Sequence, residues 1–190
     1  MDYLMLVNKE NALPEGVKVR LSFADGKLAE YQAAESYLNM KRAAFREGLR
    51  LRAMSGYRSV SYQEELLRAE AEGYLRQGFS EGEALRLALR SVAPPGKSEH
   101  NTGLALDIVR ECDEELSEEF ENTAEFRWLT QNARKFGFIL RYPRGKTAVT
   151  GYIYEPWHYR FVGREAEKIA ASGLCLEEYL KVFKGKGGFS

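Results

Sequence analysis

Histidine and cysteine are both scarce in this sequence. Only His100 and His158 occur among 190 residues, whereas a protein of this length usually spreads a few more histidines over its surface. The two cysteines, Cys112 and Cys175, form no CxxC pair, and neither lies near a histidine in sequence. We interpret the cysteines as small, semi-buried residues, with a single disulfide as the alternative.

The chain also lacks an excess of charge of either sign. Lysine and arginine total 28, as do aspartate and glutamate, so the net charge is zero. This balance argues against a nucleic-acid partner, which needs a basic stripe, and against electrostatic attachment to a membrane. No stretch approaches the roughly 18 apolar residues of a spanning helix, and the segment 1–7 is too short for a signal peptide.

The length and the absence of an internal repeat or linker predict one α+β domain over residues 1–184, with a flexible glycine-rich tail over 185–190. Hydrophobic periodicity and capping boxes at Ser61–Glu64 and Ser80–Glu83 predict where helices lie. Alternating apolar residues indicate short strands. The expected helices cover about 29–47, 61–77, 80–92, 123–135, 164–172 and 176–183; the expected strands cover 49–54, 104–109, 138–141 and 151–154, with a polar loop at 142–150.

Both histidines stand beside carboxylates, in the segments 98–107 and 155–158. Catalytic zinc prefers three protein ligands from His, Asp or Glu and keeps a fourth position for water. We therefore interpret His100, Asp107 and His158 as the ligands of one Zn²⁺, with Glu155 beside the metal as the general base of a hydrolytic reaction. Regular strand alternation would place Glu155 and His158 on opposite faces, so this interpretation requires a bulge or bend at Pro156.

Each of these residues also has an ordinary structural interpretation. Lone histidines are often simply packed or exposed, Asp107 could cap an element or form a salt bridge, and Glu155 could be solvated. Trp157 could belong to the core rather than to a substrate cleft. Arg58 alone would be a surface arginine.

Three motifs in the same order resemble one known family. Ser-x-His-x-x-Gly-x-Ala-x-Asp spans residues 98–107, Glu-x-Trp-His spans 155–158, and Ser-Gly-Tyr-Arg-Ser spans 55–59, followed by Gln63. Together they resemble the VanY-type zinc D-alanyl-D-alanine carboxypeptidases and the related LD-carboxypeptidases of bacterial cell walls. The resemblance extends over nearly the whole chain, from about residue 3 to the helix after residue 162, and implies a small central antiparallel sheet flanked by helices.

The resemblance also implies roles for individual residues. His100, Asp107 and His158 would bind one zinc ion, Glu155 would be the catalytic base, and Arg58 would stabilise the developing oxyanion. The implied substrate-binding residues are Ser98, Gln63, Tyr57 and Trp157.

The implied function is removal of the terminal D-alanine from peptidoglycan stem peptides. The partners would be those peptides, with no nucleic acid, and the chain would act as a monomer. An extracytoplasmic location would follow if an export segment had been removed. Two alternatives remain at this point: a module that binds wall peptides without cleaving them, and a domain whose zinc only holds the fold.

Overall fold

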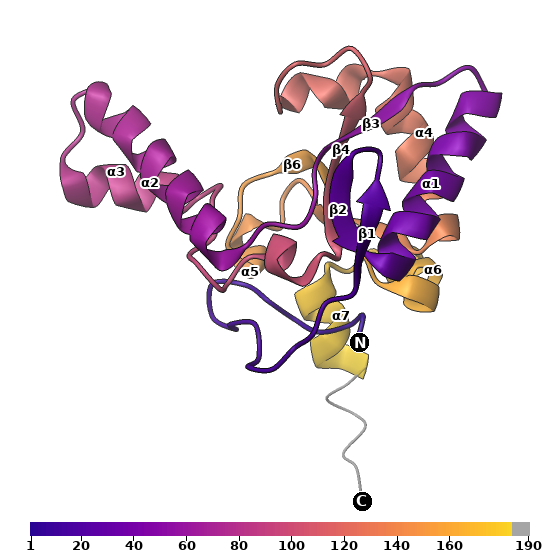
Figure 1. Ribbon diagram of the computed structural model, residues 1–190, viewed down its shortest axis with the longest axis horizontal. Coiled ribbons are helices and arrows are strands. Elements are labelled where there is room, and N and C mark those ends of the chain that lie inside the picture. Colours follow the sequence, from indigo (N-terminus) through magenta and orange to yellow (C-terminus); the bar gives the residue numbers. More distant parts are fainter. Residues whose placement is uncertain (184–190) are drawn as a thin grey trace, which may run out of the picture.

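The computed structural model describes residues 1–183 and confirms an α+β domain built on small antiparallel sheets (Figure 1). The predicted tail at 185–190 lies outside the described residues. The main sheet has the order β3-β4-β6-β5, and β1 and β2 form a separate hairpin. The strands are β1 (Leu21–Ala24), β2 (Lys27–Glu30), β3 (Leu51–Ser55), β4 (Ala105–Arg110), β5 (Phe138–Tyr142) and β6 (Glu155–Phe161). The α-helices are α1 (Tyr31–Arg46), α2 (Val60–Arg76), α3 (Glu81–Ala88), α4 (Ala124–Asn132), α5 (Thr147–Thr150), α6 (Ala166–Ser172) and α7 (Leu176–Phe183).

The main core lies between α1 and one face of the four-stranded sheet. Tyr37 and Met40 of α1 pack in one cluster with Leu106, Ile108 and Tyr159 of the sheet, and all five are fully buried. A second cluster joins β5 to α6 and α7, which lie together at the lower side of the molecule in Figure 1. The central strands β4 and β6, which carry Asp107 and His158, are therefore packed into the main core.

The β1–β2 hairpin corrects the predicted start of the first helix. Residue 29 was expected to be helical, but it belongs to β2, and α1 begins at Tyr31. Glu30 caps this helix, since its carboxylate accepts the N–H groups of Gln32 and Ala33. Asp25 and Gly26 form the turn with φ of +58° and +80°, the positive values that a two-residue hairpin turn requires.

Helices α2 and α3 form an arm that projects from the body of the molecule (Figure 1). The Ser80–Glu83 capping box is present at the start of α3, as predicted. The predicted Ser61–Glu64 box is wrong, because Ser59 caps α2 by accepting the N–H of Tyr62. No helix within residues 1–183 is long and apolar enough to cross a membrane.

The last strand and the segment before it also differ from expectation. The strand predicted at 151–154 instead begins at Glu155 and continues through Pro156 to Phe161. The segment 142–150, predicted as a loop, contains the short helix α5. The predicted helix 123–135 is α4, capped by Thr123, followed by a 3-10 helix at Ala133–Phe136.

Candidate active site and metal centre

Strand pairing brings two of the predicted zinc ligands together. Asp107 on β4 lies directly opposite His158 on β6, and on its other side it lies opposite Ser55 on β3. Side chains opposite each other in antiparallel strands share one face of the sheet. The register of the central strands therefore places the Asp107 and His158 side chains next to each other on one face of the sheet.

A bulge in β6 brings Glu155 to the same place. Leu140 on β5 pairs with Tyr159, whereas Tyr142, two residues later, pairs with Glu155, four residues from Tyr159. The extra residues lie around Pro156, where a bend was predicted. As a result, Glu155 Oε2 is 3.2 Å from His158 Nδ1, and both side chains are buried.

His100 reaches the group from a 3-10 helix at Glu99–Thr102, which ends at Gly103 with φ of +70°. The His100 Nδ1–H donates to the carbonyl of Gly56 at 2.7 Å. This bond fixes the ring and leaves Nε2 directed at Asp107 Oδ2, 3.4 Å away.

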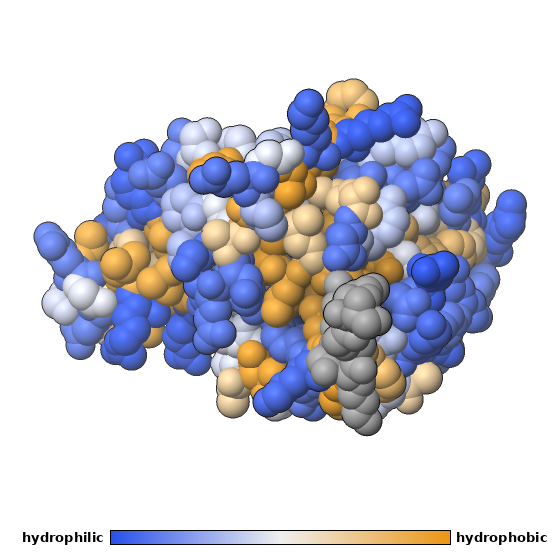
Figure 2. Space-filling model, turned by 90° about the horizontal axis from the view of Figure 1, so that it is seen from below, coloured by the Kyte–Doolittle hydropathy of each residue, from blue (hydrophilic) through white to orange (hydrophobic). Residues whose placement is uncertain are grey.

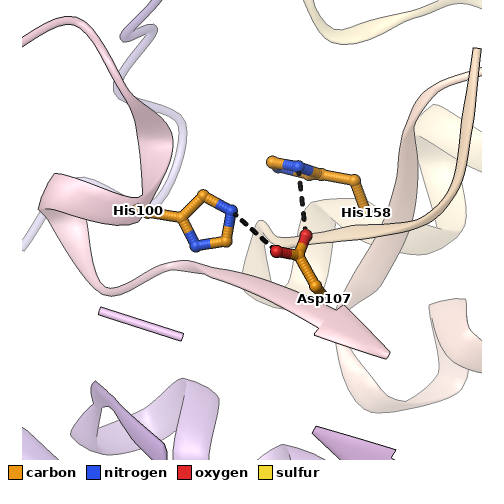
Figure 3. Close-up of side chains that lie close together, drawn as sticks. All are labelled: His100, Asp107 and His158. Atoms are coloured by element: carbon orange, nitrogen blue, oxygen red, sulfur yellow. Dashed lines mark ion pairs between the residues drawn. The ribbon is translucent and has the colours of Figure 1, made fainter. Parts of the chain in front are cut away.

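His100, Asp107 and His158 thus form a compact buried group (Figure 3), in which one candidate donor atom from each residue lies within 4.8 Å of the others. Asp107 Oδ1 is 3.5 Å from His158 Nδ1 and has no hydrogen-bond partner within residues 1–183. Buried polar atoms without a partner are costly. Two imidazole nitrogens and one carboxylate oxygen are a set of ligand atoms that zinc prefers, so these residues fit a zinc ion.

Glu155 lies beside this group with a perturbed acidity. Burial raises the pKa of its carboxyl group, although the neighbouring His158 opposes that shift. A carboxylate with a raised pKa accepts a proton more readily near neutral pH, which suits a general base.

Arg58 is drawn toward the same carboxylate as the histidines. Its Nη2 donates to Asp107 Oδ2 at 2.7 Å, and its Nε donates to Ser55 Oγ at 3.0 Å. Burial raises the pKa of Asp107, but His100 and Arg58 outweigh it and hold the pKa well below its ordinary value. Asp107 therefore stays ionised, as a metal ligand must.

The group opens into a cavity of about 500 Å³ between α2 and the first residues of β6. A larger hollow of about 830 Å³ lies near the N-terminal segment, but neither histidine lines it. Gln63, Ser98 and Trp157, for which substrate binding is predicted, line the smaller cavity. Tyr57 is not among its lining residues; the Tyr57 backbone N–H bonds to the carbonyl of Leu28.

The sequence reasoning missed a charged cluster behind the ligands. Glu99 is fully buried, and its Oε1 accepts hydrogen bonds from Arg141 Nε at 2.7 Å and Arg160 Nη1 at 2.6 Å. Burial raises the Glu99 pKa, but the two guanidinium groups outweigh this and hold it well below its ordinary value. The available signal was the position of Glu99, between Ser98 and His100 of the first motif.

Comparison with known proteins gives consistent matches. Residues 26–164 match the family model described as "VanY: D-alanyl-D-alanine carboxypeptidase". The putative carboxypeptidase YodJ of Bacillus subtilis is 42% identical over 95% of this chain and 68% of its own length.

Solved structures are also similar to this chain. VanYB in complex with D-alanine-D-alanine is similar with a TM-score of 0.86, at 38% identity and over 95% of this chain and 98% of that one. A VanY variant from a VanB-type resistance cassette, solved with Zn(II), gives 0.85 at 38% identity, over 95% and 99% of the two chains. The LD-carboxypeptidase LdcB gives 0.79 at 39% identity, over 94% and 86%.

Proposed function

Because the chain belongs to the VanY family of D-alanyl-D-alanine carboxypeptidases, we propose that it is a zinc-dependent carboxypeptidase. Its substrates are peptidoglycan stem peptides, from which it removes the terminal D-alanine by hydrolysis. The observation that carries this proposal is the buried group of His100, Asp107 and His158, with Glu155 beside it in one cavity.

The residues that would hold zinc are His100 through Nε2, His158 through Nδ1 and Asp107 through its carboxylate, because Nε2 of His100 faces Asp107 Oδ2 and Nδ1 of His158 faces Asp107 Oδ1. A bound zinc ion supplies a Lewis acid and lowers the pKa of water to about 7. Three ligands in an open cavity favour a catalytic site over a structural one, which usually closes all four positions with protein ligands.

Glu155 then acts as the general base and acid. Its Oε2 takes a proton from the water that attacks the scissile carbonyl carbon. The same carboxyl group delivers that proton to the nitrogen of the departing D-alanine as the carbon–nitrogen bond breaks. The burial that raises the Glu155 pKa helps it to do both.

Arg58 stabilises the oxygen that becomes negatively charged in this step. Its guanidinium carries a fixed charge and forked donors, and the contacts to Ser55 and Asp107 hold it in the cavity.

Gln63 and Ser98 form hydrogen bonds with the substrate peptide. Gln63 Nε2 is bound to the Ala93 carbonyl, which leaves its buried Oε1 without a partner in residues 1–183 and suited to accept a peptide N–H.

Trp157 supplies an apolar wall to the same cavity. Hydrophobic side chains gather in the central part of the face in Figure 2 and toward its α2–α3 end, whereas most of the remainder is hydrophilic.

One chain provides every proposed site residue, so we propose a monomer. Its place of action is the cell envelope, where its proposed substrate lies.

The test is mass spectrometry of muropeptides after incubation with the zinc-loaded protein. Loss of one alanine from pentapeptides identifies DD-carboxypeptidase activity, and loss from tetrapeptides identifies LD-carboxypeptidase activity. A chelator should abolish either reaction, and zinc should restore it. Binding of muropeptides without turnover would overturn the proposal in favour of a binding module.

A further inference from the structure

The two nitrogens of the His158 ring face different carboxylates. Nδ1 is approached by Glu155 Oε2 at 3.2 Å and by Asp107 Oδ1 at 3.5 Å. Nε2 faces Glu99 Oε2 at 3.6 Å instead, and neither of these two atoms has a hydrogen-bond partner within residues 1–183. A small movement of the ring would let the Nε2–H donate to Glu99, which would leave Nδ1 as the nitrogen that can bind metal.

Glu99 is fixed by two fully buried arginines. Its Oε1 accepts from both Arg141 and Arg160, and this leaves Oε2 directed at His158. Arg160 Nη2 also donates to the backbone carbonyls of Tyr3 and Met5, which ties the N-terminal segment to the same cluster.

Helix α7 completes the cluster from the other side. Glu177 binds Arg141 in a bidentate manner, with Nη1–Oε2 at 2.8 Å and Nη2–Oε1 at 2.6 Å. Glu99, Glu177, Arg141 and Arg160 together carry no net formal charge. Removing one member of a buried charge network leaves its partner uncompensated, so both carboxylates are needed to balance the arginines.

We propose that Glu99 is a positioning residue for His158, and that Glu177 extends this role to helix α7. Glu99 accepts the Nε2–H of His158, which fixes the tautomer and the ring orientation that present Nδ1 to zinc. Glu177 neutralises Arg141, which would otherwise draw Glu99 away from the ring. Glu177 lies outside the residues 26–164 that match the family model. The inference rests on the proposed zinc function.

The first experiment compares zinc dissociation constants, measured by competition with a chelator of known affinity. Outer partners of metal ligands typically contribute about 10- to 100-fold to affinity. We expect a loss of this size in E99Q and a smaller loss in E177Q. The matched control is E178Q, one residue further along α7, because Glu178 pairs with Lys146 and caps the helix at Cys175 without touching Arg141.

E99Q removes one of the negative charges that balance two buried guanidinium groups, and this variant can therefore fail to fold. In that case the comparison of E177Q with E178Q tests the proposal. Equal losses in E177Q and E178Q would mean that displacement of α7, and not the charge on Arg141, is responsible, and this would overturn the proposal. Parent affinity in E177Q would also overturn it. Failure of the parent protein to bind zinc would instead refute the proposed function.

The second readout is imidazole ¹⁵N–¹H NMR of the zinc-loaded protein, which is simple because the chain has only two histidines. We expect opposite tautomers, with the proton on Nδ1 in His100 and on Nε2 in His158. The His158 proton should shift in E177Q and stay unchanged in E178Q. A proton on Nδ1 of His158, or a resonance that E177Q leaves unmoved, would refute the positioning role.

Discussion

Glu155 Oε2 lies 3.2 Å from His158 Nδ1, although both residues belong to the same strand and are three positions apart. The extra residues of β6 opposite β5 turn the Glu155 side chain back toward the imidazole. One irregular strand thus supplies both a proposed zinc ligand and the proposed base. Their separation is therefore set by a local backbone feature.

E155Q should retain zinc and lose turnover. Glutamine keeps the shape of the side chain but cannot accept the proton of the attacking water, and general-base catalysis typically contributes about 10²- to 10⁴-fold. We therefore expect kcat to fall by at least this factor on muropeptide substrates, with the zinc content by mass spectrometry unchanged.

E64Q, on the exposed side of α2, is the matched control and should behave as the parent does. If E155Q cleaves as fast as E64Q, another group is the base and the proposed mechanism is wrong. If E155Q instead loses its zinc, the carboxylate is needed for metal binding and the two roles must be reassigned.

Zinc binding should release a proton from His158. Burial lowers the pKa of this imidazole, but Glu155, Glu99 and Asp107 raise it more, to about 9 in the zinc-free protein. Zinc needs the unprotonated Nδ1, so below pH 9 it must displace a proton, and the apparent affinity should rise with pH until about 9. Titration calorimetry at pH 7.5 in buffers of different ionisation enthalpy should report close to one proton released.

The same shift sets the sign for the stability of the zinc-free protein. A pKa raised from 6.5 to about 9 on folding stabilises the fold fully below pH 6.5, and this contribution disappears as the pH rises through about 9. The melting temperature of the zinc-free protein should therefore contain a contribution from His158 that decreases between pH 6.5 and about 9.

The calorimetric result can contradict both expectations. If zinc binding releases no proton at pH 7.5, His158 is already neutral at that pH in the zinc-free protein.

The sequence was most informative where chemistry restricts residue type. His100, Asp107, His158 and Glu155 were predicted because both histidines stand beside carboxylates and because the motifs around them resemble one family, and the structure brings the four side chains together. The required bulge at Pro156 followed from strand alternation. Helix α3 was found through its Ser80–Glu83 box, a short-range interaction that sequence alone specifies.

The rest depended on long-range packing. Arg141 and Arg160 resemble solvent-facing strand residues, and only the tertiary fold buries them against Glu99. The last strand was predicted at 151–154, whereas β6 spans Glu155–Phe161 and contains Pro156, a residue type that usually argues against a strand. The β1–β2 hairpin was not predicted, although Asp25–Gly26 is a dipeptide that favours two-residue turns.

R58K should separate charge from geometry in the proposed oxyanion role. Lysine keeps the positive charge but cannot contact Asp107 and Ser55 with one planar group, as Arg58 does. Removing one oxyanion donor typically costs about 10²- to 10³-fold in kcat. We expect a fall approaching this size, with little change in zinc content. The control is R68K on the exposed side of α2; equal rates in both variants would remove Arg58 from the mechanism.

G56A should damage both the fold and the metal site, because Gly56 lies under the β1–β2 hairpin. A Cβ atom at this position would be 2.2 Å from the carbonyl oxygen of Leu28, so the backbone must shift. Overpacking of this kind typically costs about 1–3 kcal/mol of unfolding free energy. The Gly56 carbonyl also accepts the His100 Nδ1–H, so the shift should weaken zinc binding.

The matched control is G82A in α3, where a Cβ meets nothing within 4 Å and alanine should stabilise the helix by up to about 1 kcal/mol. Denaturant unfolding and zinc competition measure the two effects. Loss of stability in G56A with parent zinc affinity would show that the Gly56 carbonyl does not position His100.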